Sequence, residues 1–278
     1  MSIFEAILLG AIQGITEFLP VSSSGHLVLF QKILNISEPA LFFDTMVHVG
    51  TLAAVFIVLW KDILDILRKP VQPLTGYLIL ATLPAVIVAL AGKDLIEAAF
   101  ASGSFLGFAF LITAALLVGS EFLSRRRAGS PDGGGLKGKD DIRWPDALVI
   151  GILQGVAVIP GVSRSGATLS GSLSRRLNRD FAARFSFLLS IPAILGALVL
   201  QVKDLADPAE GLAENAAGGG IGALPIIAGT LAAAVVGFFS VRLMMKIVRE
   251  RSLLGFAVYT GILGLLVLID QAGTHLFF

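Results

Sequence analysis

Six apolar stretches, each close to the length of a membrane-spanning helix, constrain this sequence more than any other feature. A spanning helix needs roughly 20 mainly apolar residues. The chain has 55% apolar residues, only 15% charged residues and a mean hydropathy of +0.87, whereas soluble domains have about 25% charged residues. The predicted spans are 41–60, 74–92, 104–123, 185–200, 222–241 and 253–270. The sequence therefore predicts an all-α, polytopic membrane helix bundle.

Two further apolar stretches are interrupted in mid-run. Residues 3–30 and 147–171 each contain Pro, Gly and Ser clusters near their centres. Irregular backbone is tolerated at membrane depth only where it is buried in protein or lines a cavity. We therefore expect two re-entrant helix-loop-helix segments here. Because Glu5 lies in the first apolar run and no basic region precedes it, a cleaved signal peptide is not expected.

The basic residues are concentrated in a few loops. Of the 21 Lys and Arg residues, 17 lie in four segments that fall on one face, namely 61–73, 124–146, 172–184 and 242–251. By the positive-inside rule these loops are cytoplasmic, so both termini are predicted to be external. The acidic stretch 204–214 and the glycines at 218–220 would then also be external. The Gly-rich stretch 129–139 is interpreted as a flexible cytoplasmic linker.

The sequence contains an internal repeat. A shift of 141 residues aligns residues 10–25 with residues 151–166 and gives seven identities in sixteen positions. Apolar composition alone does not explain Gln, Ser and Gly in register, so we infer a duplication. Each half then holds one broken segment and three spans, and an odd number of spans makes the repeats inverted. We predict a first repeat at 1–123, a cytoplasmic linker at 124–146 and a second repeat at 147–278.

The two broken segments bring ionisable side chains to membrane depth. A charged side chain there costs at least about 2.5–3.5 kcal/mol on insertion scales and is tolerated where it meets partners or a wet cavity. Glu17, His26 and Arg164 are therefore predicted to form a functional site. The alternative is a Glu–Arg pair that only holds the two halves together. Gln13 lies four residues before Glu17, on the same helix face.

A Ser-rich turn follows a proline in each broken segment, at 22–25 and at 163–166, and is expected to open a new half-helix. Hydroxyl and N–H groups at a helix N-terminus bind anions, and an arginine adds bidentate phosphate recognition. Phosphate is therefore the predicted ligand. Its expected contacts are Gln13, Ser22, Ser24, Ser163, Ser165, Gly166 and Thr168. Alternatively, the serines only cap helices and the threonine bonds back to its own helix.

Ser23 has two candidate bases close to it in the sequence. Glu17 precedes it by six residues and His26 follows it by three. Either could accept the hydroxyl proton while Arg164 stabilises charge developing at a phosphorus atom. Because pyrophosphate carries several negative charges, we expect Mg²⁺ or Ca²⁺ bound through Glu17 and substrate oxygens. Whether Ser23 is a nucleophile or only a ligand stays open.

Asp44 and His48 form a second polar pair, four residues apart at the start of the first span. They could face the same cavity. As an isolated pair they are interpreted as supporting or interfacial residues.

The stretches QGITEFLPVSSSGHL and PGVSRSGATLSG, followed by FSFLLSIP, resemble the undecaprenyl-pyrophosphate phosphatases of the bacitracin-resistance type, and the resemblance covers the whole chain. It implies a bacterial inner-membrane hydrolase that converts the C55 isoprenyl pyrophosphate to the monophosphate and phosphate. This reaction recycles the lipid carrier for peptidoglycan synthesis and confers bacitracin resistance. The family motifs match Glu17, Ser22, Ser23, His26, Ser163, Arg164, Ser165, Gly166 and Thr168.

The resemblance also implies partners and shows one departure. The expected partners are the isoprenyl pyrophosphate and membrane lipids, with no nucleic acid, and a homodimer is an open alternative.

Many family members have an acidic residue where Gln13 stands. Gln13 can ligate a metal or bond to phosphate, but it cannot act as a base, which shifts the acid–base work to Glu17 and His26.

A second hypothesis comes from a different class of protein. Inverted repeats with broken helices at the midplane are typical of transporters, so a transporter or flippase of a polyprenyl-phosphate carrier is the alternative function. The combination of Ser, His, Glu and Arg is more than a binding site needs, and it favours chemistry.

Overall fold

The computed structural model describes residues 1–36, 41–128, 135–206 and 221–276. Within these ranges the regular secondary structure is helical, apart from an isolated β-bridge between Lys137 and Leu177. The all-α prediction is therefore confirmed.

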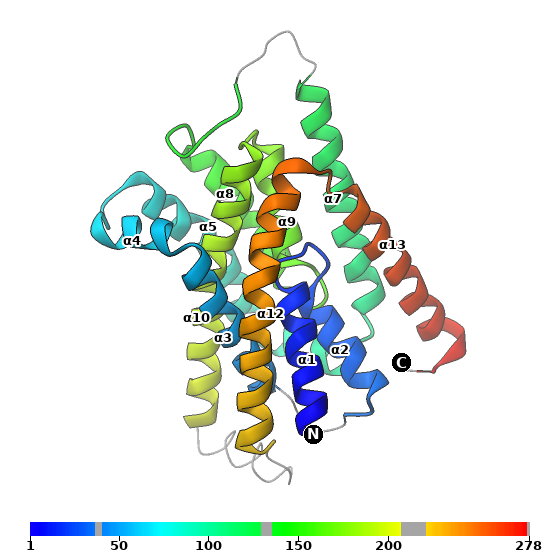
Figure 1. The fold of residues 1–278 in the computed structure, drawn as a ribbon. Helices are drawn as coiled ribbons and strands as arrows, with labels where there is room; N and C mark the ends of the chain where they lie inside the picture. The colour runs from blue at the N-terminus through cyan, green and yellow to red at the C-terminus, as the bar shows by residue number, and fades with distance from the viewer. Residues whose placement is uncertain (37–40, 129–134, 207–220, 277–278) are drawn as a thin grey trace.

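Long helices cross the bundle between its upper and lower ends (Figure 1). They are α3 (Leu41–Val58), α5 (Pro73–Ala91), α7 (Leu106–Ala128), α10 (Arg179–Ala206), α12 (Ala223–Glu250) and α13 (Leu254–Ile269). In the described part of the chain, five of them have the length and apolarity of a membrane span, and α3 becomes a sixth when it is taken with the helix that follows it. The chain is thus a multi-pass membrane protein. Helices α10 and α12 extend beyond the predicted 185–200 and 222–241, partly because charged residues continue each helix at its basic end.

Both interrupted stretches form helix-loop-helix segments, as predicted. The first consists of α1 (Ile3–Thr16) and α2 (Ser23–Ile33), and the second of α8 (Trp144–Val156) and α9 (Arg164–Ser174). In Figure 1 the first pair enters from the lower end and returns to it, whereas the second pair enters from the upper end. Their turns therefore meet inside the bundle.

Two short helices stand where the sequence indicated only loops. Helix α4 (Trp60–Arg68) follows α3 directly and is bent by 79° from it. Its Ile63 is buried while Lys61 and Arg68 are exposed, and such two-sided character suits a helix that lies along the membrane surface. Helix α6 (Lys93–Ser102) connects α5 to α7.

The two halves of the chain make reciprocal contacts. Helix α1 packs mainly on α12, and α8 packs mainly on α5. Likewise α3 packs on α12, α10 packs on α5, and α7 packs on α13. The contacts α1–α12 and α3–α12 thus have their counterparts in α8–α5 and α10–α5, and α7 packs on its own counterpart α13, as an inverted repeat requires. The division into 1–123, 124–146 and 147–278 stays a prediction.

Close approaches at glycine seat the re-entrant helices deep in the bundle. A Cβ atom on Gly10 of α1 would lie 2.1 Å from the carbonyl oxygen of Gly229 in α12. At the equivalent position of the other half, a Cβ atom on Gly151 of α8 would lie 2.7 Å from the carbonyl oxygen of Ala81 in α5. Only glycine permits these backbones to come so near.

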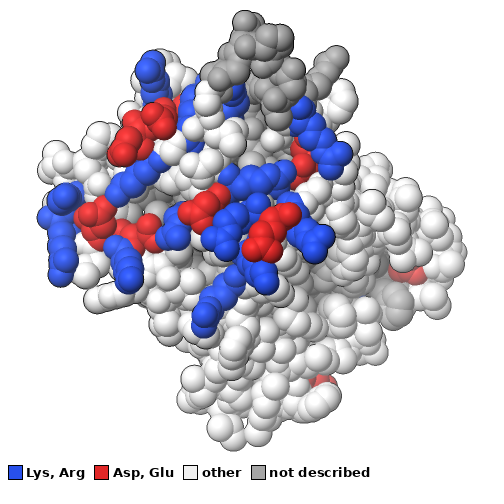
Figure 2. Space-filling view, turned by 45° about the horizontal axis from the view of Figure 1, so that its top comes forward, with Lys and Arg blue, Asp and Glu red and all other residues white. Residues whose placement is uncertain are grey.

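Charged residues gather at one end of the molecule. Figure 2 shows Lys and Arg side chains clustered on the end that is uppermost in Figure 1. Helix α1 begins, and α13 ends, at the opposite end (Figure 1). Most of the acidic stretch 204–214 and the glycines at 218–220 lie outside the described residues.

The linker is only partly described. Residues 129–134 lie outside the described ranges. The residues from 135 onwards are bound to the rest of the protein, whereas the sequence predicted a flexible linker over 129–139. The Lys137 N–H donates to the Arg176 carbonyl at 2.8 Å, and the Lys137 ammonium pairs with Asp146 at 2.7 Å. These contacts dock the linker on the second half.

We expect Gly10→Ala to lower the stability of the protein by about 1–3 kcal/mol, because the new methyl group must push α1 away from α12. Gly76→Ala in α5 is the matched control, since a Cβ atom there meets nothing within 4 Å. Thermal unfolding of the purified variants in detergent measures the effect. Equal midpoints for the two variants would contradict the close packing described above.

Candidate active site

The two re-entrant turns are joined directly to each other. The Ser165 hydroxyl donates to the Leu19 carbonyl at 2.9 Å. Arg164, the first residue of α9, donates through Nη2 to Oε1 of Glu17, which lies at the end of α1. The sequence predicted that these segments meet, and the structure brings Glu17 and Arg164 into contact.

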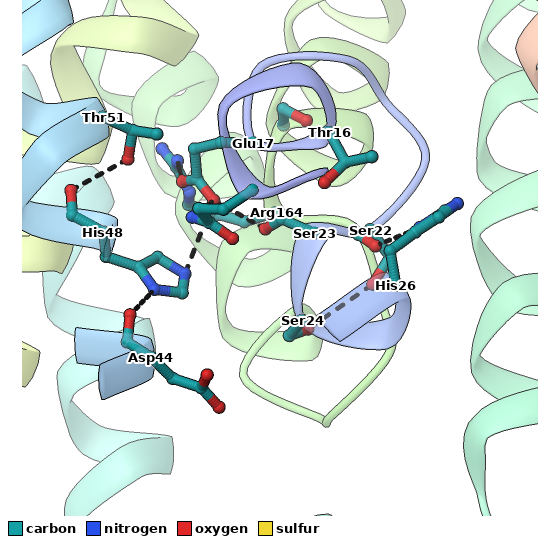
Figure 3. A network of polar contacts seen from close by, with 12 residues as sticks. Thr16, Glu17, Ser22, Ser23, Ser24, His26, Asp44, His48, Thr51 and Arg164 are labelled. Carbon is teal, nitrogen blue, oxygen red and sulfur yellow. Dashed lines mark hydrogen bonds and ion pairs between the residues drawn. The ribbon is translucent and has the colours of Figure 1, made fainter. Parts of the chain in front are cut away.

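Glu17 is the centre of a polar network (Figure 3). Its carboxylate is almost completely buried, with a side-chain exposure of 4%. While Oε1 accepts from Arg164, Oε2 accepts from the Ser23 hydroxyl at 2.6 Å and from the Gln13 amide at 2.9 Å. The His48 Nε2 atom lies 3.5 Å from the same Oε2. Residues from α1, α2, α3 and α9 thus converge on one carboxylate.

Only part of the Arg164 guanidinium is hydrogen-bonded. Its Nη1 atom is buried and has no hydrogen-bond partner among the described residues. A buried donor without a partner costs about 1–3 kcal/mol, and more when it is charged. Arg164 also lines a cavity, so its guanidinium is a candidate contact for an anion there.

The cavity has a volume of about 740 Å³ and two chemically different parts. The polar part is lined by Glu17, Ser23, Ser24, Asp44, His48, Ser163, Arg164 and Ser165. The apolar part lies between α5 and α10 and includes Ala85, Val86, Ala89, Leu90, Leu195, Val199 and Leu200. Several of these apolar side chains are largely exposed, Leu90 by 61% and Val199 by 67%, on helices that have the length and apolarity of membrane spans. The cavity therefore leads from the polar network towards lipid.

The first serine of each turn caps a helix. The Ser22 hydroxyl accepts from the Gly25 N–H at 3.1 Å, and the Ser163 hydroxyl accepts from the Gly166 N–H at 3.0 Å. Both hydroxyls, and the Gly166 N–H, are thus already used within the turns, which is the capping alternative considered above. Ser24, unlike Ser22, lines the cavity, and its hydroxyl accepts from the Gly161 N–H at 3.4 Å.

Thr168 and His26 lie behind the cavity rather than in its lining. The Thr168 hydroxyl donates to the Arg164 carbonyl at 2.9 Å and lies 2.6 Å from the Ser186 hydroxyl. In Figure 3 the His26 ring points away from Glu17, on the other side of α2. The structure therefore does not bring these two side chains together with Ser23 and the Arg164 guanidinium.

His48 has a more central place than the sequence indicated. Its Nδ1 atom lies 2.6 Å from the Asp44 carbonyl, which can only accept, so Nδ1 carries a proton and Nε2 faces Glu17. The Asp44 carboxylate, in turn, accepts from the Gln31 amide at 2.8 Å. The sequence did contain a signal for His48. It is an ionisable residue at the start of a span, and such a side chain, like that of Glu17, is tolerated in a membrane where it meets partners or a wet cavity.

The donor groups suit a cation that arrives with a phosphate ligand. Within the described ranges, no cluster of three or more His, Asp and Glu residues could hold a metal alone. However, Glu17 and Asp44 both line the cavity, and the buried Oε1 of Gln13 has no partner among the described residues. Mg²⁺ is commonly bound by one or two carboxylates plus substrate phosphates. The residues therefore fit a substrate-bridged divalent cation.

Fold and site together define a polytopic membrane protein with a buried polar network that lines one part of a cavity whose other part is apolar. The chain belongs to the family described as "Bacitracin resistance protein BacA", whose model matches residues 6–266. This result confirms the family that the sequence motifs indicated.

Similar proteins extend over the full chain. Undecaprenyl-diphosphatase from Carboxydothermus hydrogenoformans is 44% identical over 272 residues, which cover 98% of each chain. Undecaprenyl-diphosphatase 3 from Bacillus cereus is 41% identical over 271 residues, again 98% of each chain. Undecaprenyl-diphosphatase from Methanosphaera stadtmanae is 39% identical over 291 aligned positions, covering 97% of this chain and 98% of the relative.

Proposed function

We propose that this chain hydrolyses undecaprenyl pyrophosphate to undecaprenyl phosphate and inorganic phosphate, which recycles the lipid carrier for peptidoglycan synthesis and confers bacitracin resistance. The family description and the names of the full-length relatives support this function. The structural observation that carries it is the unpaired, buried Nη1 of Arg164 beside the hydrogen-bonded Ser23–Glu17 pair. It provides an anion contact next to an activated hydroxyl.

The two parts of the cavity match the two parts of such a substrate. The pyrophosphate would lie at the polar end, where Arg164 Nη1 binds an oxygen of the terminal phosphate. The isoprenyl chain would extend between α5 and α10 and leave the cavity towards lipid. Burial of the first isoprene units there provides affinity through the hydrophobic effect.

Ser23 is the proposed nucleophile and Glu17 its base. The 2.6 Å hydrogen bond lets Glu17 accept the hydroxyl proton as the Ser23 oxygen attacks the terminal phosphorus. The bond from phosphorus to the bridging oxygen breaks, and undecaprenyl phosphate leaves with the proton that Glu17 returns to it. Water then attacks the phosphoserine while Glu17 accepts a proton from it. The bond from phosphorus to the Ser23 oxygen breaks, Glu17 returns the proton to that oxygen, and phosphate is released.

Arg164 and His48 would provide the electrostatic part of the reaction. Arg164 is held in place by Glu17 and presents Nη1 to the phosphate, so it needs little reorganisation as charge develops in the transition state. His48, 3.5 Å from Glu17, is close enough to share a proton with that carboxylate during the two steps.

A divalent cation, Mg²⁺ or Ca²⁺, is part of the proposal. Glu17 would hold it together with substrate oxygens, and Asp44 lines the same cavity. When bound, the cation neutralises pyrophosphate charge and polarises the phosphoryl oxygens.

The proposed location is the bacterial inner membrane, with the active site open to the external side. The basic end of the bundle is cytoplasmic by the positive-inside rule, so both termini would be external. Helix α10 begins with Arg179 at the basic end, and its cavity-lining residues 192–200 lie in its opposite half. The cavity is therefore displaced towards the external end.

The alternative function, transport or flipping of the lipid carrier, is not favoured. The relatives are named as diphosphatases, and the Ser23–Glu17 contact pairs a hydroxyl with a base, as hydrolysis needs.

We expect the purified protein to release phosphate from undecaprenyl pyrophosphate and Arg164→Lys to lose at least about 100-fold in kcat/KM. A lysine can pair with Glu17 but has no second nitrogen to donate to the phosphate. Loss of one such donor lowers the rate by about 10²–10³-fold. Arg68→Lys, on the exposed surface of α4, is the matched control. Wild-type rates in Arg164→Lys would refute the assigned phosphate contact.

Replacement of Ser23 separates a nucleophile from a ligand. Ser23→Ala should reduce kcat by about 10³-fold or more, since it removes the hydroxyl that is proposed to form the covalent intermediate. Ser24→Ala removes a neighbouring cavity hydroxyl that has no carboxylate partner, and it should keep at least about a tenth of the activity. Phosphate release assays measure both. If Ser23→Ala also keeps a tenth of the activity, water rather than Ser23 is the nucleophile.

The metal proposal predicts that chelation abolishes phosphate release and that Mg²⁺ or Ca²⁺ restores it. In Gln13→Glu a second carboxylate faces Glu17, whose oxygen now lies 2.9 Å from the Gln13 amide. This variant should need less Mg²⁺ for half-maximal activity, and Mg²⁺ should raise its thermal midpoint more than that of the wild type. Full activity in excess chelator would contradict the proposal.

A further inference from the structure

His26 is held on all sides, although it lies only three residues after Ser23. Its ring is 3% exposed and stacks on Tyr259 of α13, with ring centroids 5.8 Å apart and planes inclined by 12°. The edge contact to Phe110 of α7 has a centroid distance of 5.5 Å. These two rings come from spans in different halves of the chain.

Both ring nitrogens of His26 are occupied. Nδ1 lies 2.7 Å from the Ser22 carbonyl, and Nε2 lies 2.8 Å from the Tyr259 hydroxyl. Because a carbonyl oxygen can only accept, Nδ1 must carry a proton, and the Nε2 of a neutral ring then accepts from the tyrosine. The hydrogen bonds therefore fix one tautomer and leave no nitrogen directed at the Ser23 hydroxyl, which already donates to Glu17.

The carbonyl that His26 holds belongs to a strained residue. Ser22 has φ 72° and ψ 94°, in the region that side chains other than glycine rarely adopt. Such a conformation persists only when its surroundings fix it. The Ser22 carbonyl accepts from both the backbone N–H of His26, at 3.1 Å, and the ring Nδ1. The next residue along the chain is Ser23.

We propose that His26 is a positioning residue: together with Tyr259 it locks the Ser22 carbonyl, and thereby holds the Ser23 hydroxyl against Glu17, and it transfers no proton in the reaction. Tyr259 acts one step further away, by fixing the tautomer of the imidazole. This assignment rests on the proposed phosphatase function and deepens it. It also gives Tyr259, which the sequence analysis did not select, a place in the site.

The test compares His26→Asn with His26→Ala in the purified full-length protein. The amide nitrogen of asparagine occupies nearly the place of Nδ1 and can donate to the Ser22 carbonyl, but it cannot titrate. We expect His26→Asn to stay within roughly tenfold of the wild-type kcat, with an unchanged KM and pH profile. His26→Ala should lose about 100-fold in kcat. If His26→Asn is as inactive as His26→Ala, or loses one limb of the pH profile, His26 transfers a proton and the inference fails.

Tyr259→Phe keeps the stacked ring and removes only the hydroxyl, so it tests the same lock with little risk to folding. It should lower kcat roughly two- to fivefold without changing KM. Tyr77→Phe is the matched control, because Tyr77 is the only other tyrosine in the chain. Equal rates in the two variants would remove Tyr259 from the proposal.

A spectroscopic readout keeps this inference separate from the proposed function. In ¹⁵N-histidine-labelled protein, the signal that disappears in His26→Asn should show a protonated Nδ1 and an unprotonated Nε2 that do not change from about pH 6 to about pH 8. Titration of that signal in this range would overturn the inference even if no phosphate is released. An inactive wild type with the expected tautomer would overturn only the phosphatase assignment.

Discussion

The buried ion pair between Glu17 and Arg164 is the interaction on which the rest of this structure depends. It joins the turns of two segments that enter the bundle from opposite ends. Removal of either partner would leave a charge buried and unpaired, which costs about 3–5 kcal/mol. The pair also uses only part of the arginine, because Nη1 stays without a partner among the described residues. The Glu17–Arg164 contact thus joins the two re-entrant turns and also holds the rest of the arginine side chain in position.

The glycines and the strained serine explain how the chain reaches this contact. Gly10 and Gly151 let the backbones of α1 and α8 approach those of α12 and α5 closely, and the turns that follow α1 and α8 contact each other. The positive φ of Ser22 then turns the chain so that the first hydroxyl of α2 faces Glu17. Small residues and local strain therefore position the site, while the polar residues supply its chemistry.

Much of this arrangement could be predicted from the sequence, for physical reasons that are local. Hydropathy predicted the spans, Pro, Gly and Ser clusters predicted the re-entrant turns, and the cost of buried charge selected Glu17 and Arg164. The direction of a side chain at the end of a turn depends on contacts far away in the sequence, and here the prediction was weaker. His26 faces Tyr259, 233 residues later, while His48 from another span faces Glu17.

The most direct test of the account is a structure of the protein with a non-hydrolysable analogue of the isoprenyl pyrophosphate. We predict that an oxygen of the terminal phosphate contacts Arg164 Nη1, that the Ser23 hydroxyl oxygen lies in line with the terminal phosphorus, and that the isoprenyl chain lies between α5 and α10. A terminal phosphate bound away from Arg164, with Nη1 still unpaired and Ser23 turned from the phosphorus, would contradict it.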